Sequence, residues 1–185
     1  MRELALHLLD IAENSVAAGA RNITISVVED LVHDRLNMAV RDDGCGMDAA
    51  TTARVVDPFV TSRTTRKVGL GLPLLKAAAE ACNGYLAIDS ALGCGTTITV
   101  EFQRSHIDRM PLGDLAGTCF SLLITVPDVH WLFRYQVGEL KFEFDDAPVK
   151  QELEGISLSE PEVITYLRST LEEGISELRK QPAYT

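Results

Sequence analysis

Two polar residues near the N-terminus, Asp10 and Asn14, have the types and spacing needed for chemistry. They lie four residues apart in a segment with helical periodicity, so both side chains are expected on one face of a helix. A carboxylate at Asp10 could orient or deprotonate a water molecule. The amide oxygen of Asn14 is a suitable ligand for a hard cation such as Mg²⁺. This pair is therefore a candidate metal ligand beside a candidate general base.

A glycine-rich turn, Asp42–Met47 (DDGCGM), follows a predicted strand. The carboxylate of Asp42 could accept a hydrogen bond from an exocyclic amine. Gly44 and Gly46 carry no side chain, which would let a flat ring approach the backbone. An ordinary polar turn has the same composition, so the motif alone is a weak signal.

A second glycine motif, Gly69–Leu72 (GLGL), leads into a predicted helix. The backbone N–H groups and the positive dipole end of a helix N-terminus suit phosphate oxygens. Arg63, Arg66 and Lys67 come just before the motif and could neutralise further phosphate charge. The alternative interpretation of these cations is a mobile surface loop. Gly95 and Thr96 begin another predicted strand and complete the set of candidate groups.

Hydrophobic periodicity predicts the elements that must position these groups. Helical spacing predicts helices over residues 3–18, 69–82, 112–125 and 159–178, the last with Ser159 as its N-cap and Glu162 at its third position. Alternation predicts strands over residues 22–29, 36–41, 85–89, 96–102, 131–137 and 140–144. This order predicts an α/β (α+β) two-layer sandwich, with a mixed, mostly antiparallel sheet covered by helices on one side.

Composition narrows the classes of partner. The chain has 185 residues, 46% of them apolar, and a formal charge of −10, which disfavours nucleic acids and anionic membranes. No segment is long and apolar enough to span a bilayer, and the N-terminus has no signal-peptide pattern. The four cysteines show no CxxC spacing, which favours reduced thiols in a cytoplasm. We therefore expect a cytoplasmic protein with a partner other than nucleic acid or membrane.

Taken together, the motifs resemble the boxes of the GHKL superfamily of ATP-binding domains, which includes gyrase, a heat-shock chaperone, histidine kinases and MutL. The segment DIAENSVAAGA looks like the N box, and VRDDGCGM looks like the first glycine box. DPFVTSRTTRKVGLGLPLLK is similar to a phosphate lid with the second glycine box, and GCGTTITVEF is similar to the last box. The resemblance covers roughly residues 3–103 and implies a Bergerat-type fold with ATP and Mg²⁺ as cofactors. The lid looks more like that of a histidine kinase or an anti-sigma-factor kinase, and the chain looks closest to a stand-alone histidine-kinase-like ATPase.

The resemblance also implies roles for individual residues. Asp42 would bind the adenine amine, Asn14 would ligate Mg²⁺, and Thr96 would help hold adenine through a water molecule. Asp10 occupies the place of the catalytic carboxylate, where hydrolytic members usually carry glutamate, so water activation is an open question. Lys67 stands where the second glycine box usually begins with glycine. The remaining residues implied to bind the nucleotide are Gly44, Gly46, Met47, Arg63, Lys67, Gly69, Leu70, Gly71 and Leu72.

We expect two regions: an ATP-binding domain over residues 1–103 and a small acidic α/β extension over residues 104–185. The extension either binds a partner or covers the sheet. His106 lies in SHIDRMPL, which superficially resembles a histidine-kinase phosphoacceptor segment. That segment belongs before the ATP domain rather than after it, so a structural role for His106 is favoured. His7 shares a helix face with Asp10, and a structural role is favoured there too.

The favoured function is a kinase-like ATPase that transfers or hydrolyses the γ-phosphate in concert with a separate protein. The first alternative is a non-catalytic switch that changes shape with ATP and turns over little. A mismatch-repair-like ATPase is a weaker alternative, because the chain is short for a second domain and acidic for DNA. The partners expected are ATP or ADP and a protein, with a homodimer as an open alternative.

Overall fold

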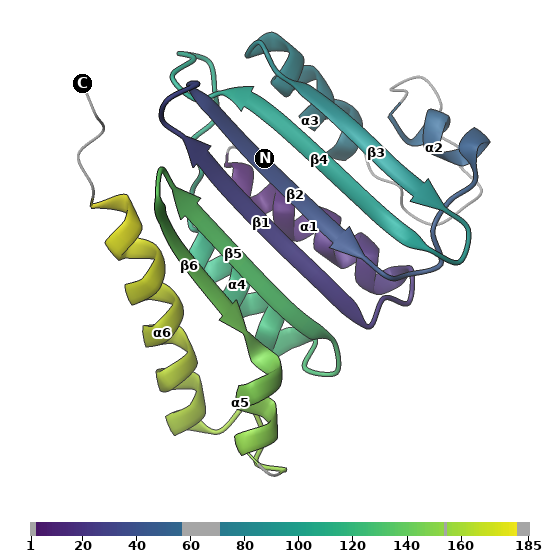
Figure 1. Cartoon of the computed structure of the whole chain (residues 1–185). Coiled ribbons are helices and arrows are strands. Elements are labelled where there is room, and N and C mark those ends of the chain that lie inside the picture. The colour runs from purple at the N-terminus through teal and green to yellow at the C-terminus, as the bar shows by residue number, and fades with distance from the viewer. Residues whose placement is uncertain (1–2, 57–70, 154, 181–185) are drawn as a thin grey trace.

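The computed structural model describes residues 3–56, 71–153 and 155–180, which form one mixed sheet with helices packed against it (Figure 1). The strand order is β3-β4-β2-β1-β5-β6, and only β1 and β5 run parallel. The strands are β1 (Asn22–Asp30), β2 (Arg35–Asp42), β3 (Tyr85–Ala91), β4 (Gly95–Gln103), β5 (His130–Val137) and β6 (Leu140–Asp145). The helices are α1 (Leu4–Ala17), α2 (Ala49–Val55), α3 (Gly71–Ala81), α4 (Leu115–Thr125), α5 (Asp146–Glu152) and α6 (Pro161–Arg179).

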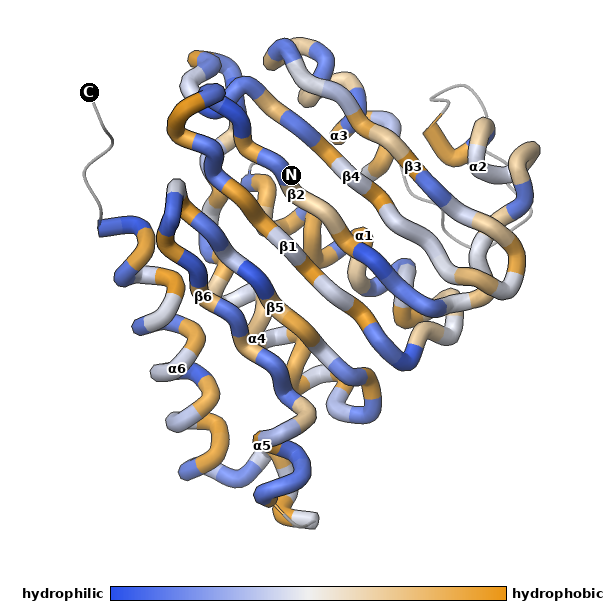
Figure 2. Tube along the Cα trace, viewed as in Figure 1, coloured by the Kyte–Doolittle hydropathy of each residue, from blue (hydrophilic) through white to orange (hydrophobic). Residues whose placement is uncertain are grey.

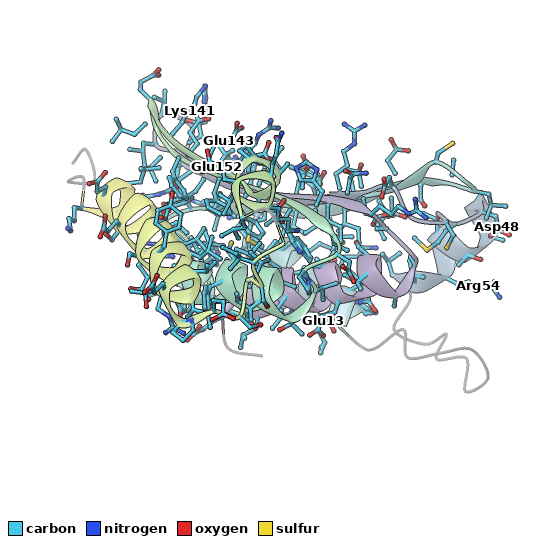
Figure 3. The ribbon with its side chains drawn as sticks, turned by 90° about the horizontal axis from the view of Figure 1, so that it is seen from below. Glu13, Asp48, Arg54, Lys141, Glu143 and Glu152 are labelled. Atoms are coloured by element: carbon cyan, nitrogen blue, oxygen red, sulfur yellow. The ribbon has the colours of Figure 1, made fainter. Side chains whose placement is uncertain are left out.

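The predicted two-layer sandwich is confirmed. Seen along the plane of the sheet, α1, α4 and α6 lie beneath it, while Lys141 and Glu143 project from the opposite, open face (Figure 3). Hydrophobic and hydrophilic residues alternate along β1 and β5 (Figure 2). On β1 the buried positions are Ile23, Ile25 and Val27. Because successive strand residues point to opposite faces, this alternation sets the side on which the helices pack.

The helix layer buries the apolar stripe that the periodicity of α1 predicted. Leu4, Leu8 and Ile11 are each at most 3% exposed and belong to the same core as the inner face of the sheet. Leu75 of α3 is fully buried in that core as well. Both helices thus lie on the same face of the sheet (Figure 1).

Residues beyond 103 continue the same sheet. β5 pairs with β1 along its whole length, and its inward residue Trp131 is fully buried. Trp131 stacks on Phe133, which stacks on Phe144 of β6. α6 buries an apolar stripe, including Leu167 and Leu171, against α4 and β6. The helix therefore covers the edge of the sheet that is formed by β5 and β6.

Two short helices were not predicted, and one helix start was predicted wrongly. α2 and α5 have seven residues each, too few to show a clear period. The N-cap of α6 is Glu160 rather than Ser159, so Glu162 is its second helical residue. Pro161 explains the shift, because its ring has no N–H and suits the first helical position. Among the described residues, no helix is long and apolar enough to cross a membrane.

Candidate functional site

A row of polar side chains crosses the helix-covered face at one end of the sheet. Ser90 of β3 pairs with Thr96 of β4, and Thr96 pairs with Asp42 of β2. The next inward row contains Ile88 and Ile98, which belong to the apolar core. Burying polar groups costs free energy unless they are hydrogen-bonded, so this row depends on the hydrogen bonds described below.

The carboxylate of Asp42 is the centre of this row. Its side chain is 8% exposed, and three donors hold it. Ser15 Oγ of α1 donates to Oδ2 at 2.6 Å, while the backbone N–H groups of Gly44 and Thr96 donate to Oδ1 at 2.9 and 3.2 Å. An ionised carboxylate has about four acceptor positions. Oδ2, with one donor, keeps the capacity to accept one more hydrogen bond.

Ser90 links the row to the glycine-rich turn. Its hydroxyl oxygen accepts a hydrogen bond from the backbone N–H of Met47 at 2.8 Å and lies 2.8 Å from Thr96 Oγ1. The Ser90 hydroxyl also lies within donating distance, 3.2 Å, of the Gly95 carbonyl oxygen. One side chain therefore orients both the end of the turn and the hydroxyl of Thr96.

The backbone of the turn is held between α1 and the hairpin of β3 and β4. Cys45 N–H donates to the carbonyl oxygen of Ala18 at 3.0 Å, and Gly93 N–H donates to the carbonyl oxygen of Cys45 at 2.8 Å. Gly46 has φ +65°, and a Cβ atom there would lie 1.9 Å from the carbonyl oxygen of Ala91. The close packing of these backbones therefore requires glycine at this position.

Asp43, next to Asp42, ties the turn to the start of β1. Its Oδ1 accepts from the backbone N–H groups of Arg21 and Asn22 at 2.7 and 2.9 Å, and its Oδ2 accepts from Asn22 Nδ2 at 2.6 Å. These hydrogen bonds, the Asn22 side chain first, hold the pKa of Asp43 below its ordinary value. Asp43 is therefore ionised at neutral pH.

On α1, Asp10 is half-buried and Asn14 is exposed, while the neighbouring Ser15 is buried against Asp42. One helix thus presents a carboxylate, an amide and a hydroxyl within six residues. His7 is 4% exposed, and burial lowers its pKa, an effect that the charge of Asp10 partly opposes. A neutral buried ring agrees with a structural role.

The phosphate-binding part of the prediction is only partly described. Gly71 and Leu72 form the first residues of α3, with Leu72 buried. Arg63, Arg66, Lys67, Gly69 and Leu70 lie outside the described residues. His106 lies in a turn after β4, where its Nδ1 accepts a hydrogen bond from the backbone of Asp108.

Sequence reasoning missed Ser90 of this row and Ser15 of α1, which donates to its central carboxylate. Ser15 interrupts the line of apolar residues on the buried face of α1, and this interruption was a usable signal. Ser90 was missed because the predicted strand ended at Asp89, whereas β3 continues to Ala91. An antiparallel register carried one residue further would have placed Ser90 opposite Thr96.

Known proteins resemble the first part of the chain. Residues 1–106 match the family described as histidine kinase-, DNA gyrase B-, and HSP90-like ATPase. A cell-division control histidine kinase, PdhS of Brucella ovis, is 33% identical over 120 residues, covering 58% of this chain and 11% of the relative. The heme sensor protein HssS of Staphylococcus saprophyticus is 34% identical over 91 residues, covering 49% of this chain and 19% of the relative. The chain thus corresponds to less than a fifth of either relative.

Two solved structures are also similar. The Aquifex aeolicus MutL ATPase domain, complexed with ADP, superposes with a TM-score of 0.51 and 14% identity, covering 95% of this chain and 70% of that one. Full-length ShkA in complex with AMPPNP gives a TM-score of 0.44 and 26% identity over 52% of this chain and 20% of that one. The MutL match shares the fold along nearly the whole chain. Because the family match covers more than half of its residues, the chain belongs to the histidine kinase-, DNA gyrase B-, and HSP90-like ATPases.

Proposed function

We propose that this protein binds ATP with Mg²⁺ and transfers or hydrolyses the γ-phosphate in concert with a separate protein. The observation that carries the proposal is the buried carboxylate of Asp42, oriented by Ser15, Gly44 and Thr96 with one acceptor position left. The exocyclic amine of adenine is a donor of the right kind for that position. The MutL domain of the same fold was solved with ADP, which supports a nucleotide as the ligand.

The residues around Asp42 fit a flat base. Gly44 and Gly46 present backbone without side chains, and Met47 is held by Ser90. Thr96 has a hydroxyl whose position is set by the same serine, so it could hold adenine directly or through a water molecule. In this proposal the turn forms the floor of the base pocket, and the hydroxyls at its edge position the ring.

Asn14 would hold Mg²⁺ through its amide oxygen, with phosphate oxygens supplying further ligands. The metal would neutralise phosphate charge, and Asp10, one helical turn earlier, would hold or deprotonate the attacking water. The N-terminus of α3 at Gly71 and Leu72 would face phosphate, joined by Gly69 and Leu70. Arg63 and Lys67 would add positive charge.

Incubation with γ-labelled ATP, with and without cell extract, tests the output. Labelled protein indicates a kinase, free phosphate indicates an ATPase, and bound but unchanged ATP indicates a switch. Asp10→Glu tests the role of Asp10 in hydrolysis. Glutamate is one methylene longer and would reach the water as in hydrolytic relatives, so this variant should change the rate of phosphate release. If neither Asp10→Glu nor Asp10→Ala changes the rate of phosphate release, Asp10 is not the base.

A protein partner is part of the proposal, and the exposed side of α6 is the candidate surface. Glu162, Glu172, Glu173 and Glu177 are exposed there, so the surface would favour a basic partner. A second copy of the chain is the alternative occupant, and both would act in the cytoplasm. Sedimentation of the purified chain with and without ATP distinguishes a homodimer from a monomer that needs another protein.

A further inference from the structure

A chain of side-chain hydrogen bonds connects the glycine-rich turn to the C-terminal part of the sheet. Asn22 Nδ2 donates to Asp43 Oδ2 at 2.6 Å. Asn22 Oδ1 lies 3.0 Å from His130 Nδ1, and His130 Nε2 lies 2.8 Å from Asp145 Oδ1. We refer to Asp43, Asn22, His130 and Asp145 as the relay. It runs from the residue after β2 across the ends of β1, β5 and β6.

The hydrogen-bonding roles of the relay residues determine how many protons the His130 ring must carry. Asp43 is ionised and can only accept, so the NH₂ group of Asn22 must face it. The carbonyl oxygen of Asn22 then faces His130, and Nδ1 must donate to it. Asp145 can also only accept when ionised, so Nε2 must donate as well. A ring that satisfies both bonds therefore carries two protons, whereas a neutral ring can donate to only one partner.

Charged groups on the neighbouring elements complete the surroundings of His130. Asp145 of β6 is ionised at neutral pH, because hydrogen bonds from Ala147 N–H and from His130 lower its pKa. Asp146 of α5 is 1% exposed and places Oδ1 3.9 Å from His130 Nε2. Lys150 lies 2.6 Å from the other oxygen of Asp146 and balances that carboxylate. No other charged group of the described residues pairs with this histidine.

The relay acts on the residue next to the centre of the site. Asp43 directly follows Asp42, and its Cα lies 2.8 Å from the place where a Cβ of Gly95 would be. The backbone also connects the two regions, because His130 N–H donates to the carbonyl oxygen of Arg21 at 2.8 Å. A change in the orientation of Asn22 would therefore alter how Asp43 is held, and with it the start of the turn.

We propose that His130 is a positioning residue for the nucleotide-binding turn, acting through Asn22 and Asp43 when its ring carries two protons. The inference rests on the proposed function for the identity of the ligand. A neutral ring would keep its one proton on Nε2 for the charged Asp145 and would lose the bond to Asn22, so nucleotide affinity should fall as the ring loses its second proton. Residues beyond the family match would thus tune the site within it.

Calorimetric titration with ADP at about pH 6 and about pH 8 tests the proposal. His33→Gln is the matched control, because His33 Nδ1 also bonds a carboxylate, Asp30 at 2.7 Å, but lies at the other end of β1. We expect His130→Gln to weaken binding at pH 6 by about threefold to tenfold, the range for one or two hydrogen bonds, and to bind like wild type at pH 8. The control should keep the pH dependence of the wild type.

Asn22→Ala provides a second variant at an exposed position. Combined with His130→Gln it should add no further loss, since both remove the same connection. An equal pH profile in wild type and His130→Gln, or additive losses in the double variant, overturns the proposal. Thermal unfolding of each variant confirms that it folds.

Nuclear magnetic resonance tests the relay without nucleotide and so separates its failure from that of the proposed function. The Asn22 side-chain amide and the Gly44 backbone amide should shift with pH in step with the His130 ring, and this shift should vanish in His130→Gln. If the Asn22 and Gly44 amide resonances do not shift together with those of the His130 ring, the relay is wrong. If the shifts are coupled but wild type binds no ADP, the relay stands and the proposed function fails.

Discussion

At the scale of single residues, Ser15 is the donor that holds Oδ2 of Asp42, the carboxylate oxygen that can still accept one more hydrogen bond. Ser15 is 5% exposed, and its hydroxyl makes the shortest of the three hydrogen bonds to the carboxylate, 2.6 Å. Hydrogen bonds to charged groups are among the stronger ones in proteins. The geometry of the base pocket therefore depends on a residue outside the expected set of ligands.

We expect Ser15→Ala to weaken ADP binding about tenfold, because the carboxylate loses its orientation and about 1.5 kcal/mol of stabilisation. Calorimetric titration measures the affinity. Ser26→Ala, on the open face of β1, is the control and should bind as wild type does. Unchanged affinity in Ser15→Ala would show that Asp42 does not need this donor.

A variant at Asn14 tests whether this residue binds Mg²⁺. Asn14→Ala should weaken binding of ATP·Mg²⁺ by about tenfold but hardly affect binding of metal-free ATP, because only the complex uses the amide oxygen. Glu13→Ala alters the adjacent exposed residue of the same helix and should affect neither. Equal losses with and without Mg²⁺ would instead indicate damage to α1.

At the scale of elements, the turn between β2 and α2 packs closely against the hairpin of β3 and β4, and one glycine from each can be compared. Gly46 and Gly93 both have positive φ, +65° and +75°. A Cβ at Gly46 would collide with the Ala91 carbonyl, whereas a Cβ at Gly93 would meet nothing within 4 Å. Both positions thus have an unfavourable φ for other residues, but only Gly46 lacks the room for a Cβ atom.

Gly93→Ala should therefore cost about 1 kcal/mol of unfolding free energy, from the unfavourable φ alone. Gly46→Ala should cost about 2–4 kcal/mol, because the turn must also move away from β3. Urea unfolding of both variants measures the difference. Equal losses would mean that the turn is not packed against the hairpin.

The elements were predictable to the extent that their patterns are local. Alternation located all six strands, and the apolar stripe located α1, because burial on one face imposes those periods. The parallel pairing of β5 with β1 could not be predicted, since it depends on contacts between residues about a hundred positions apart. The roles of Ser15 and Ser90 were hidden for the same reason. Asp42 and Thr96 were identified by resemblance, and the structure places them side by side.

At the scale of the whole molecule, the C-terminal region contributes to the same core as the ATP-binding boxes. Residues of α4, β5 and α6 join those of α1 and β1 in one buried cluster. Removing residues 159–185 would expose the apolar surfaces that α6 covers on α4 and β6. Such a truncation is therefore a test of stability before it is a test of partner binding.

Two point variants on α6 separate these roles. Leu171 is fully buried, so Leu171→Ala should lower the free energy of unfolding by about 2–5 kcal/mol. Tyr166 of the same helix is 59% exposed, so Tyr166→Ala should cost less than about 0.5 kcal/mol. Denaturant unfolding checks both values. A negligible effect of Leu171→Ala would show that α6 is not part of the core.

The nucleotide site is tested most directly by the affinity of Asp42→Asn for ADP, measured by calorimetric titration beside wild type and Asp89→Asn. Asp89 lies exposed on β3 and should be neutral to substitution. We expect wild type and Asp89→Asn to bind ADP, while Asp42→Asn loses about ten- to hundredfold in affinity, because the carboxylate that would accept from the adenine amine is gone. If folded Asp42→Asn binds ADP as tightly as wild type, the nucleotide does not sit on Asp42 and the assignment of the site is wrong.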